Sequence, residues 1–169
     1  MNTLRPKTRF DAGLTMSVMT RPGHPTNGID ALNQAIQAAV DTVDPNTLHP
    51  VAPSNAGRSF QPKAMLASII YCYARQIYAS TDIEVMMASN TDTKPFGLTA
   101  WPDAHLIREF RRENRKAIQL GLMAALWLLG QQKVEEGTVT RVNAANLAEE
   151  ASRRVIMAAF TDSMELGEG

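Results

Sequence analysis

The sequence has little of what marks several classes of protein. It contains one cysteine, Cys72, so an internal disulfide is impossible, and it has no cysteine and histidine spacing typical of a zinc site. Its longest apolar run, residues 120–130, is about half of the roughly 20 residues that span a membrane. The N-terminus lacks the apolar run of a signal peptide. We therefore expect a soluble, cytoplasmic protein without a membrane partner.

An excess of charge of one sign is also absent, because the chain carries 17 basic and 17 acidic residues. This balance argues against a polybasic binder of the histone type. The two signs are unevenly distributed, however. Residues 1–119 carry 13 basic and 10 acidic side chains, whereas residues 120–169 carry 4 basic and 7 acidic ones. A local basic surface is therefore compatible with a net charge of zero.

The apolar residues repeat with the period of a helix, and no segment shows the alternation of a strand. The helical pattern covers residues 29–43, 62–77, 81–87, 103–130 and 143–160. We predict an all-α fold of about five helices with a helix-turn-helix-like core. By composition, residues 1–28 form a flexible arm, residues 29–160 a helical domain with a linker or surface loop at 44–59, and residues 161–169 an acidic tail.

Four sites indicate where helices begin. Pro62 suits the first position of a helix. Thr81 and Glu84 have the spacing of a capping box, in which Thr81 is the cap and Glu84 reaches back to it. Asp103 and Asn143 are of the residue types that accept hydrogen bonds from free helical N–H groups. These signals place the starts of four of the predicted helices, with a single start for the long fourth helix.

Three apolar patterns predict which helix faces are buried. In residues 62–77 the inward residues are Met65, Leu66, Ile69, Ile70, Tyr73 and Ile77. In residues 143–160 they are Leu147, Ala151, Val155, Ile156, Ala159 and Phe160. The segment that begins at Leu120 and ends at Gly130 is apolar nearly all round, which is typical of a buried helix. We expect this segment and the C-terminal helix to form the contact of a homo-oligomer.

The fourth predicted helix has one basic face. At 100° per residue, its apolar residues lie on one side, and they are Leu106, Ile107, Phe110, Ala117 and Ile118. The opposite side carries His105, Arg108, Arg112, Arg115 and Lys116, with Arg111 at its flank. Such a helix fits the major groove of DNA, where arginine reads bases and holds phosphates. The alternative is a solvated face whose charges pair locally with Glu109 and Glu113.

A set of short motifs occurs in a fixed order in the middle of the chain. The motifs are Gln61-Pro62-Lys63-Ala64-Met65-Leu66, Tyr71-Cys72-Tyr73, Ser80-Thr81-Asp82-Ile83-Glu84, Trp101-Pro102-Asp103, Ile107 and Phe110-Arg111. Together they cover roughly residues 60–120. This part of the chain resembles the N-terminal, InsH-like domain of DDE transposases from bacterial insertion sequences. The resemblance implies an all-helical domain that binds the terminal repeats of a mobile element.

The resemblance does not extend to the catalytic half of these transposases. In the family, an RNase H-like domain follows, and its three carboxylates hold two metal ions. After Phe110-Arg111 only 58 residues remain, and their pattern is helical. Within the motifs, Asp82 replaces a basic residue of the family, and His105-Leu106-Ile107 replaces Thr-Ile. The loss of the basic residue at position 82 puts the family's DNA contact there in doubt.

We therefore expect a sequence-specific module for double-stranded DNA without enzymatic activity, resembling a truncated or domesticated transposase. Lys63 and Arg75 are added to the six basic residues above as candidate phosphate contacts. The alternative is an α-helical protein that uses the same fold for protein–protein interaction or self-assembly. No residue pattern predicts a cofactor, a metal or a small-molecule substrate, and Cys72 is expected to be a buried structural thiol.

Overall fold

The structure, a computed structural model, describes residues 28–51, 60–89 and 94–167. In these ranges every regular element is a helix, which confirms the all-α prediction. Instead of about five helices, the described residues form six α-helices and two short 3-10 helices. They are α1 (Gly28–Asp41), η1 (Pro45–Thr47), α2 (Pro62–Ala74), α3 (Ser80–Ser89), η2 (Lys94–Phe96), α4 (Ala104–Glu113), α5 (Arg115–Glu135) and α6 (Ala144–Glu165). The predicted arm, except for Gly28, lies outside the described residues.

Three of the predicted helix starts are confirmed. Pro62 is the first residue of α2. At α4, an Asp103 carboxylate oxygen accepts a hydrogen bond of 2.8 Å from the backbone N–H of Leu106. At α6, the side-chain oxygen of Asn143 accepts one of 3.0 Å from the N–H of Ala145. Each cap satisfies a first-turn N–H group that has no acceptor inside its own helix.

The predicted capping box at α3 is wrong. The helix begins at Ser80, one residue before the expected cap. The Thr81 hydroxyl instead donates to Glu165 Oε1 over 2.8 Å, and Glu84 Oε2 accepts from the backbone N–H of Ala104 over 2.9 Å. Both side chains therefore bind neighbouring helices, and Glu84 satisfies a free N–H at the start of α4.

The single helix predicted for residues 103–130 is also wrong, because α4 and α5 are separate helices that meet at Asn114. Asn114 is buried, and its side-chain nitrogen donates to the carbonyl oxygens of Phe110 (3.1 Å) and His49 (3.0 Å). Its side-chain oxygen accepts from the N–H of His49 over 2.8 Å. These bonds fix the α1–α2 connection to the junction, and they compete with the regular backbone pattern of one continuous helix.

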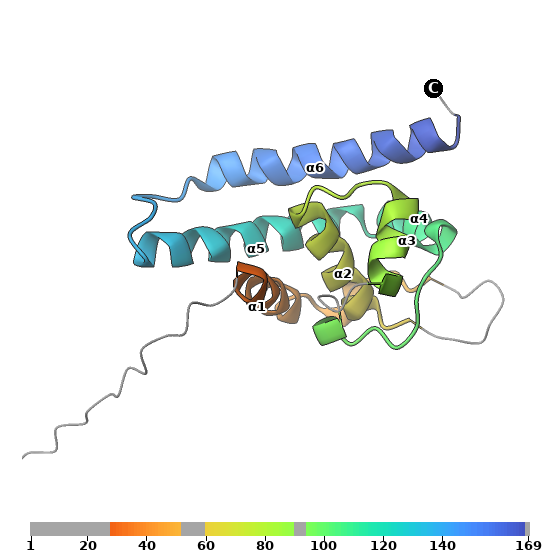
Figure 1. Ribbon diagram of the computed structural model, residues 1–169, viewed down its shortest axis with the longest axis horizontal. Helices are drawn as coiled ribbons and strands as arrows, with labels where there is room; N and C mark the ends of the chain where they lie inside the picture. The colour runs from red at the N-terminus through yellow and green to blue at the C-terminus, as the bar shows by residue number, and fades with distance from the viewer. Residues whose placement is uncertain (1–27, 52–59, 90–93, 168–169) are drawn as a thin grey trace, which may run out of the picture.

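The helices are arranged around α5 (Figure 1). Helix α6 runs back along α5, while α1 lies on the other side of α5 from α6. Helix α2 contacts α1 and α5, and α3 and α4 pack against each other at the end of the bundle where α5 begins. This arrangement places the α4–α5 junction close to the C-terminal half of α6.

The core is centred on α2, which is buried on all sides rather than along one stripe. Every residue from Ala64 to Tyr73 is buried. This includes five of the six inward residues predicted there, whereas Ile77 lies after the helix end and is partly buried. A helix that is apolar all round is expected at the centre of a bundle, because each side then faces another helix.

The apolar segment of α5 is covered mainly by helices of the same chain. Gly121, Leu122 and Ala125 are buried, and most of the other apolar residues are partly buried. Leu120 and Trp127 are the exceptions, with 50% and 37% of their surface exposed. Because α1, α2 and α6 all contact α5, helices of the same chain cover most of this segment, and its contact with a second copy stays a prediction.

Helix α6 departs from its prediction on two points. Ala151 and Val155 are buried as expected, but Ile156 and Phe160 are 53% and 59% exposed, and Ala159 is exposed as well. The helix also continues to Glu165, so most of the acidic tail predicted from residue 161 is part of α6. The physical reason is that α6 covers the bundle with one side, and Ile156 and Phe160 point away from it. Among the described residues, none of the helices has the length and apolar composition of a transmembrane span.

Candidate nucleic-acid interface

A groove with a volume of about 270 Å³ separates the α4–α5 junction from the C-terminal half of α6. Four arginines line it, together with residues from α2 and α6. The lining residues are Tyr73, Arg108, Arg111, Arg112, Arg115, Ile118, Val155, Ala159, Asp162, Ser163 and Leu166. The structure thus brings together four of the eight predicted DNA contacts, and we call this hollow the arginine groove.

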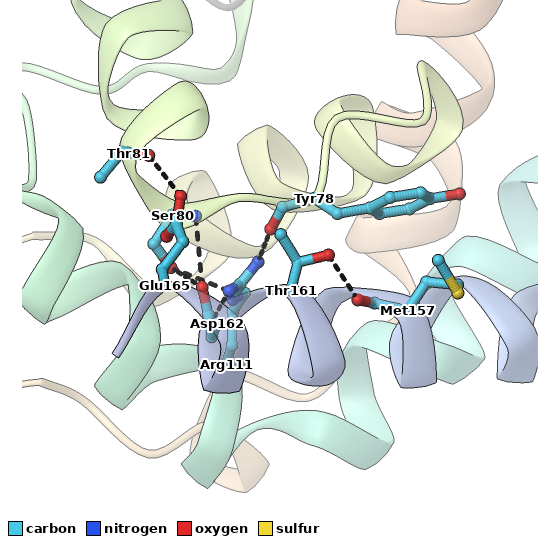
Figure 2. A network of polar contacts seen from close by, with 8 residues as sticks. All are labelled: Tyr78, Ser80, Thr81, Arg111, Met157, Thr161, Asp162 and Glu165. Atoms are coloured by element: carbon cyan, nitrogen blue, oxygen red, sulfur yellow. Dashed lines mark hydrogen bonds and ion pairs between the residues drawn. The ribbon is translucent and has the colours of Figure 1, made fainter. Parts of the chain in front are cut away.

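Arg111 lines the arginine groove, but its side chain is held by a network of polar contacts inside the protein (Figure 2). Only 6% of its side chain is exposed. It forms an ion pair with Asp162 and donates to the carbonyl oxygen of Tyr78 over 2.5 Å and to Ser80 Oγ over 2.8 Å. The guanidinium carbon also lies 5.7 Å from the centre of the Tyr73 ring. These partners hold Arg111 inside the protein, so we leave it out of the surface proposed to contact DNA.

The carboxylate of Asp162 completes this network. One of its oxygens accepts from Ser80 Oγ over 2.8 Å and from the backbone N–H of Ser80 over 3.3 Å. Burial lowers the pKa of Arg111, while the neighbouring Tyr73 hydroxyl raises it, and the side chain stays charged at neutral pH. The network ties α6 to the start of α3 and to α4. No pattern in the sequence predicted it, because residue 162 was expected to belong to an acidic tail.

Arg154, which no sequence pattern singled out, holds α6 to α2. Arg154 donates to the carbonyl oxygens of Tyr73 and Ala74, both over 2.9 Å, and it pairs with Glu150 over 2.6 Å. The carbonyl groups at a helix C-terminus have no partner in their own helix, so a cation there is favourable. Arg111 and Arg154 together fix the position of α6, and with it one wall of the arginine groove.

The other three arginines of the groove present their charge to solvent. Arg112 is 73% exposed and pairs with its neighbour Glu113 over 3.1 Å. Such an exposed pair neutralises little charge. Arg108 is half-buried and Arg115 is exposed, and neither forms an ion pair within the described residues. Three guanidinium groups therefore line one hollow whose only lining carboxylate, among the residues that the structure describes, is already paired with Arg111.

The remaining predicted contacts are not part of the groove lining. His105 is exposed in the first turn of α4, beside the Asp103 cap, and does not line the groove. Lys116 is exposed and lines a different hollow beside the end of α1. Lys63 Nζ donates to the carbonyl oxygen of Asp41 over 3.3 Å, and Arg75 donates to Tyr71 Oη over 3.2 Å. The structure therefore separates Lys63 and Arg75 from the arginine cluster.

Cys72 is buried in α2, which confirms the predicted burial of its thiol. Burial raises the pKa of its thiol to about 12, although the charges of Arg111 and Arg75 act in the opposite direction. A neutral, buried thiol is a poor nucleophile. Among the described residues, no three acidic, histidine or cysteine side chains gather in a way that could hold a metal ion.

Comparisons with family models, with curated proteins and with solved structures gave no match to this chain. The likeness to transposase N-terminal domains therefore rests on the ordered motifs in residues 60–120. Several of these motif residues have clear structural roles. Pro62 starts α2, Asp103 caps α4, and Ile107 and Phe110 are in the core.

Proposed function

We propose that this protein is a DNA-binding module that resembles a transposase N-terminal domain and contacts double-stranded DNA through the α4–α5 junction. The observation that carries the proposal is the cluster of Arg108, Arg112 and Arg115 in one groove, with no free carboxylate lining it among the described residues. DNA offers a dense row of negative charge, and arginine binds phosphates with two parallel hydrogen bonds. The zero net charge of the chain does not oppose this, because basic residues are concentrated at this junction.

The shape of α4 supports the same function. An α-helix with its side chains is about 10–12 Å across, which suits a major groove about 12 Å wide, and the 10 residues of α4 give a length of about 15 Å. Leu106, Ile107 and Phe110 are buried and hold the helix against the bundle. Arg112 points to solvent from its other side. In this proposal α3 and α4 are the two helices of a helix-turn-helix-like unit, and α4 enters the groove.

The proposal includes no catalytic step. Two-metal phosphoryl transfer needs carboxylates that converge on one site. Three carboxylates around α4 have other partners, since Asp103 caps the start of α4, Glu84 binds the N–H of Ala104 and Asp162 pairs with Arg111. The module would then position DNA without cutting it.

The test is DNA binding measured by fluorescence anisotropy at several salt concentrations. The test variant is the triple substitution Arg108→Ala, Arg112→Ala and Arg115→Ala. Its matched control is the triple substitution Lys133→Ala, Arg141→Ala and Arg153→Ala, which removes the same charge from residues outside the arginine groove. Random and genomic duplexes serve as ligands, so that no target sequence has to be assumed.

We expect the log–log slope of affinity against salt to become shallower by about 0.9 for each phosphate that the test variant no longer neutralises. The control should bind DNA nearly as well as the wild type. If the wild type shows no salt-sensitive binding to any duplex, the proposed function is wrong. If both triple variants weaken binding equally, only the total charge matters, and the α4–α5 junction is not the binding surface.

Self-assembly is a second candidate function, and the outer side of α6 favours it. Ile156, Phe160 and Met164 are 53%, 59% and 58% exposed and lie four residues apart, so they form one line along the helix. Two copies of α6 that pair antiparallel about Phe160 would bring Ile156 of each copy to Met164 of the other. Arg153, at the N-terminal edge of this line, would then face the C-terminal end of the second helix, which favours a cation.

Size-exclusion chromatography with light scattering tests this candidate. A dimer that becomes monomeric on substitution of Phe160→Glu would support pairing through α6. A wild-type monomer at high concentration would exclude it. A dimer that also binds DNA would combine both functions, since two modules related by a twofold axis read two half-sites.

A further inference from the structure

We propose that the arginine groove is a binding site for a single phosphate group, held between the arginines of the α4–α5 junction and the hydroxyl of Ser163 on α6. This inference rests on the proposed function but goes beyond it. An open basic helix would interact with DNA phosphates along its face, whereas this site is a hollow with walls from two parts of the chain. It assigns α6 to the binding site, which neither the basic pattern nor the motifs suggested.

The charges around the groove are the first argument. Arg108, Arg112 and Arg115 come from the α4–α5 side of the groove. Burial lowers the pKa of Arg111, and the charge of Arg108 lowers it further. Guanidinium groups that share a hollow repel one another, so an anion between them removes an unfavourable interaction. Asp162 does not supply that anion, because it is held by Arg111 and Ser80. The groove thus has a surplus of donors and of positive charge.

The size and the walls are the second argument. A volume of about 270 Å³ lies below the roughly 300–1,000 Å³ of sites that enclose drug-sized ligands, so it suits a small group rather than a whole nucleotide. Val155, Ala159 and Leu166 form an apolar wall on α6, and Ser163 lies among them. Arginine N–H groups on one side and one hydroxyl on the other can bind the oxygens of a tetrahedral phosphate. The apolar residues can contact the carbon group of a phosphate ester.

The position of the wall is rigid, which a preformed site requires. Arg154 fixes α6 to the end of α2 through two carbonyl oxygens, and Asp162 fixes it to Arg111 and Ser80. Ser163 directly follows Asp162, so its backbone is held by this network. The phosphate can come from one of two sources. It can belong to the backbone of duplex DNA, or it can be a small molecule, either free phosphate or a phosphate monoester. The experiment separates these two sources.

The experiment compares thermal unfolding of the full chain in inorganic phosphate and in chloride at equal ionic strength. Ala159→Glu is the test variant, because it places a carboxylate in the groove at an exposed helical position. Ala145→Glu is the matched control, an exposed alanine on the same helix that does not line the groove. Ser163→Ala is a milder variant that keeps the charge. All four proteins are then titrated with labelled duplex DNA.

We expect phosphate to raise the Tm of the wild type and of Ala145→Glu by about 5–10 °C at 100-fold excess over Kd. Ala159→Glu should have a Tm in chloride at least equal to that of the wild type, because its carboxylate occupies the site, and phosphate should not raise it. Ser163→Ala should bind phosphate a few-fold more weakly. If the DNA backbone is the source, Ala159→Glu should also bind duplex at least 10-fold more weakly than Ala145→Glu.

The two proposals can fail separately. Phosphate stabilisation that Ala159→Glu abolishes, with unchanged DNA affinity, would support the site and assign it to free phosphate or a monoester. Phosphate binding without any DNA binding would keep the site and refute the proposed function. If phosphate raises the Tm no more than chloride does, or raises that of Ala159→Glu equally, the phosphate site is refuted, whatever the result with DNA.

Discussion

The ion pair between Arg111 and Asp162 gives the sharpest prediction for stability. In the substitution Asp162→Ala, Arg111 stays buried, with 6% of its side chain exposed, and loses its carboxylate. The N–H and hydroxyl of Ser80 lose an acceptor as well. Leaving one charge of a buried pair without its partner typically costs about 3–5 kcal/mol. We expect a value of about 3 kcal/mol, because Arg111 keeps its bonds to Tyr78 and Ser80.

The assay is urea unfolding followed by circular dichroism. With a slope of about 2 kcal/mol per molar, a destabilisation of about 3 kcal/mol lowers the midpoint by roughly 1.5 M. Glu165→Ala is the control, because it removes an exposed carboxylate one turn later that accepts from Thr81, and its effect should be at most about 0.5 kcal/mol. The double variant Arg111→Met with Asp162→Leu should be more stable than Asp162→Ala, since it buries no charge. A destabilisation below about 1 kcal/mol for Asp162→Ala would refute the reasoning.

Three further predictions concern other parts of the chain. Asn114→Ala should lower the free energy of unfolding by about 1–3 kcal/mol, because the hydrogen bonds of this buried side chain with His49 and Phe110 disappear. Urea unfolding measures this change, and an unchanged midpoint would contradict the role of Asn114 in fixing the junction. Hydrogen bonding to Arg154 lowers the pKa of Glu150 in the folded protein. The contribution of Glu150 to the free energy of unfolding is therefore present above its ordinary pKa of 4.5 and disappears as the pH falls through the lower folded-state pKa. Unfolding of Glu150→Gln should therefore depend less on pH in this acid range than unfolding of the wild type, and equal pH profiles would refute this. The Cys72 thiol, whose pKa is raised to about 12, should not react with a thiol reagent at pH ~8 until the protein is unfolded, and rapid reaction in the native state would show that it is accessible.

Local chemistry explains why part of the fold could be predicted. The starts of α2, α4 and α6 depend on Pro62, Asp103 and Asn143, and each acts within three residues of its own position. The helical class follows from the apolar period, which needs no knowledge of the partner helices. The break at Asn114 was not predictable in this way, because it depends on His49, which lies 65 positions away. The same holds for Glu84, whose acceptor role is decided by α4.

The basic face shows the same division between sequence and tertiary structure. The helical period of residues 104–113 is enough to predict that arginines gather on one side of this segment. Helix packing sets the different roles of these arginines: Arg111 forms an internal ion pair, whereas Arg108, Arg112 and Arg115 line a groove with their charge available to a ligand. Asp162, the residue that makes this difference, is 51 positions away and reaches Arg111 only because α6 folds back along α5. A charge is recognised from its residue type, but whether it is neutralised depends on which helix packs against it.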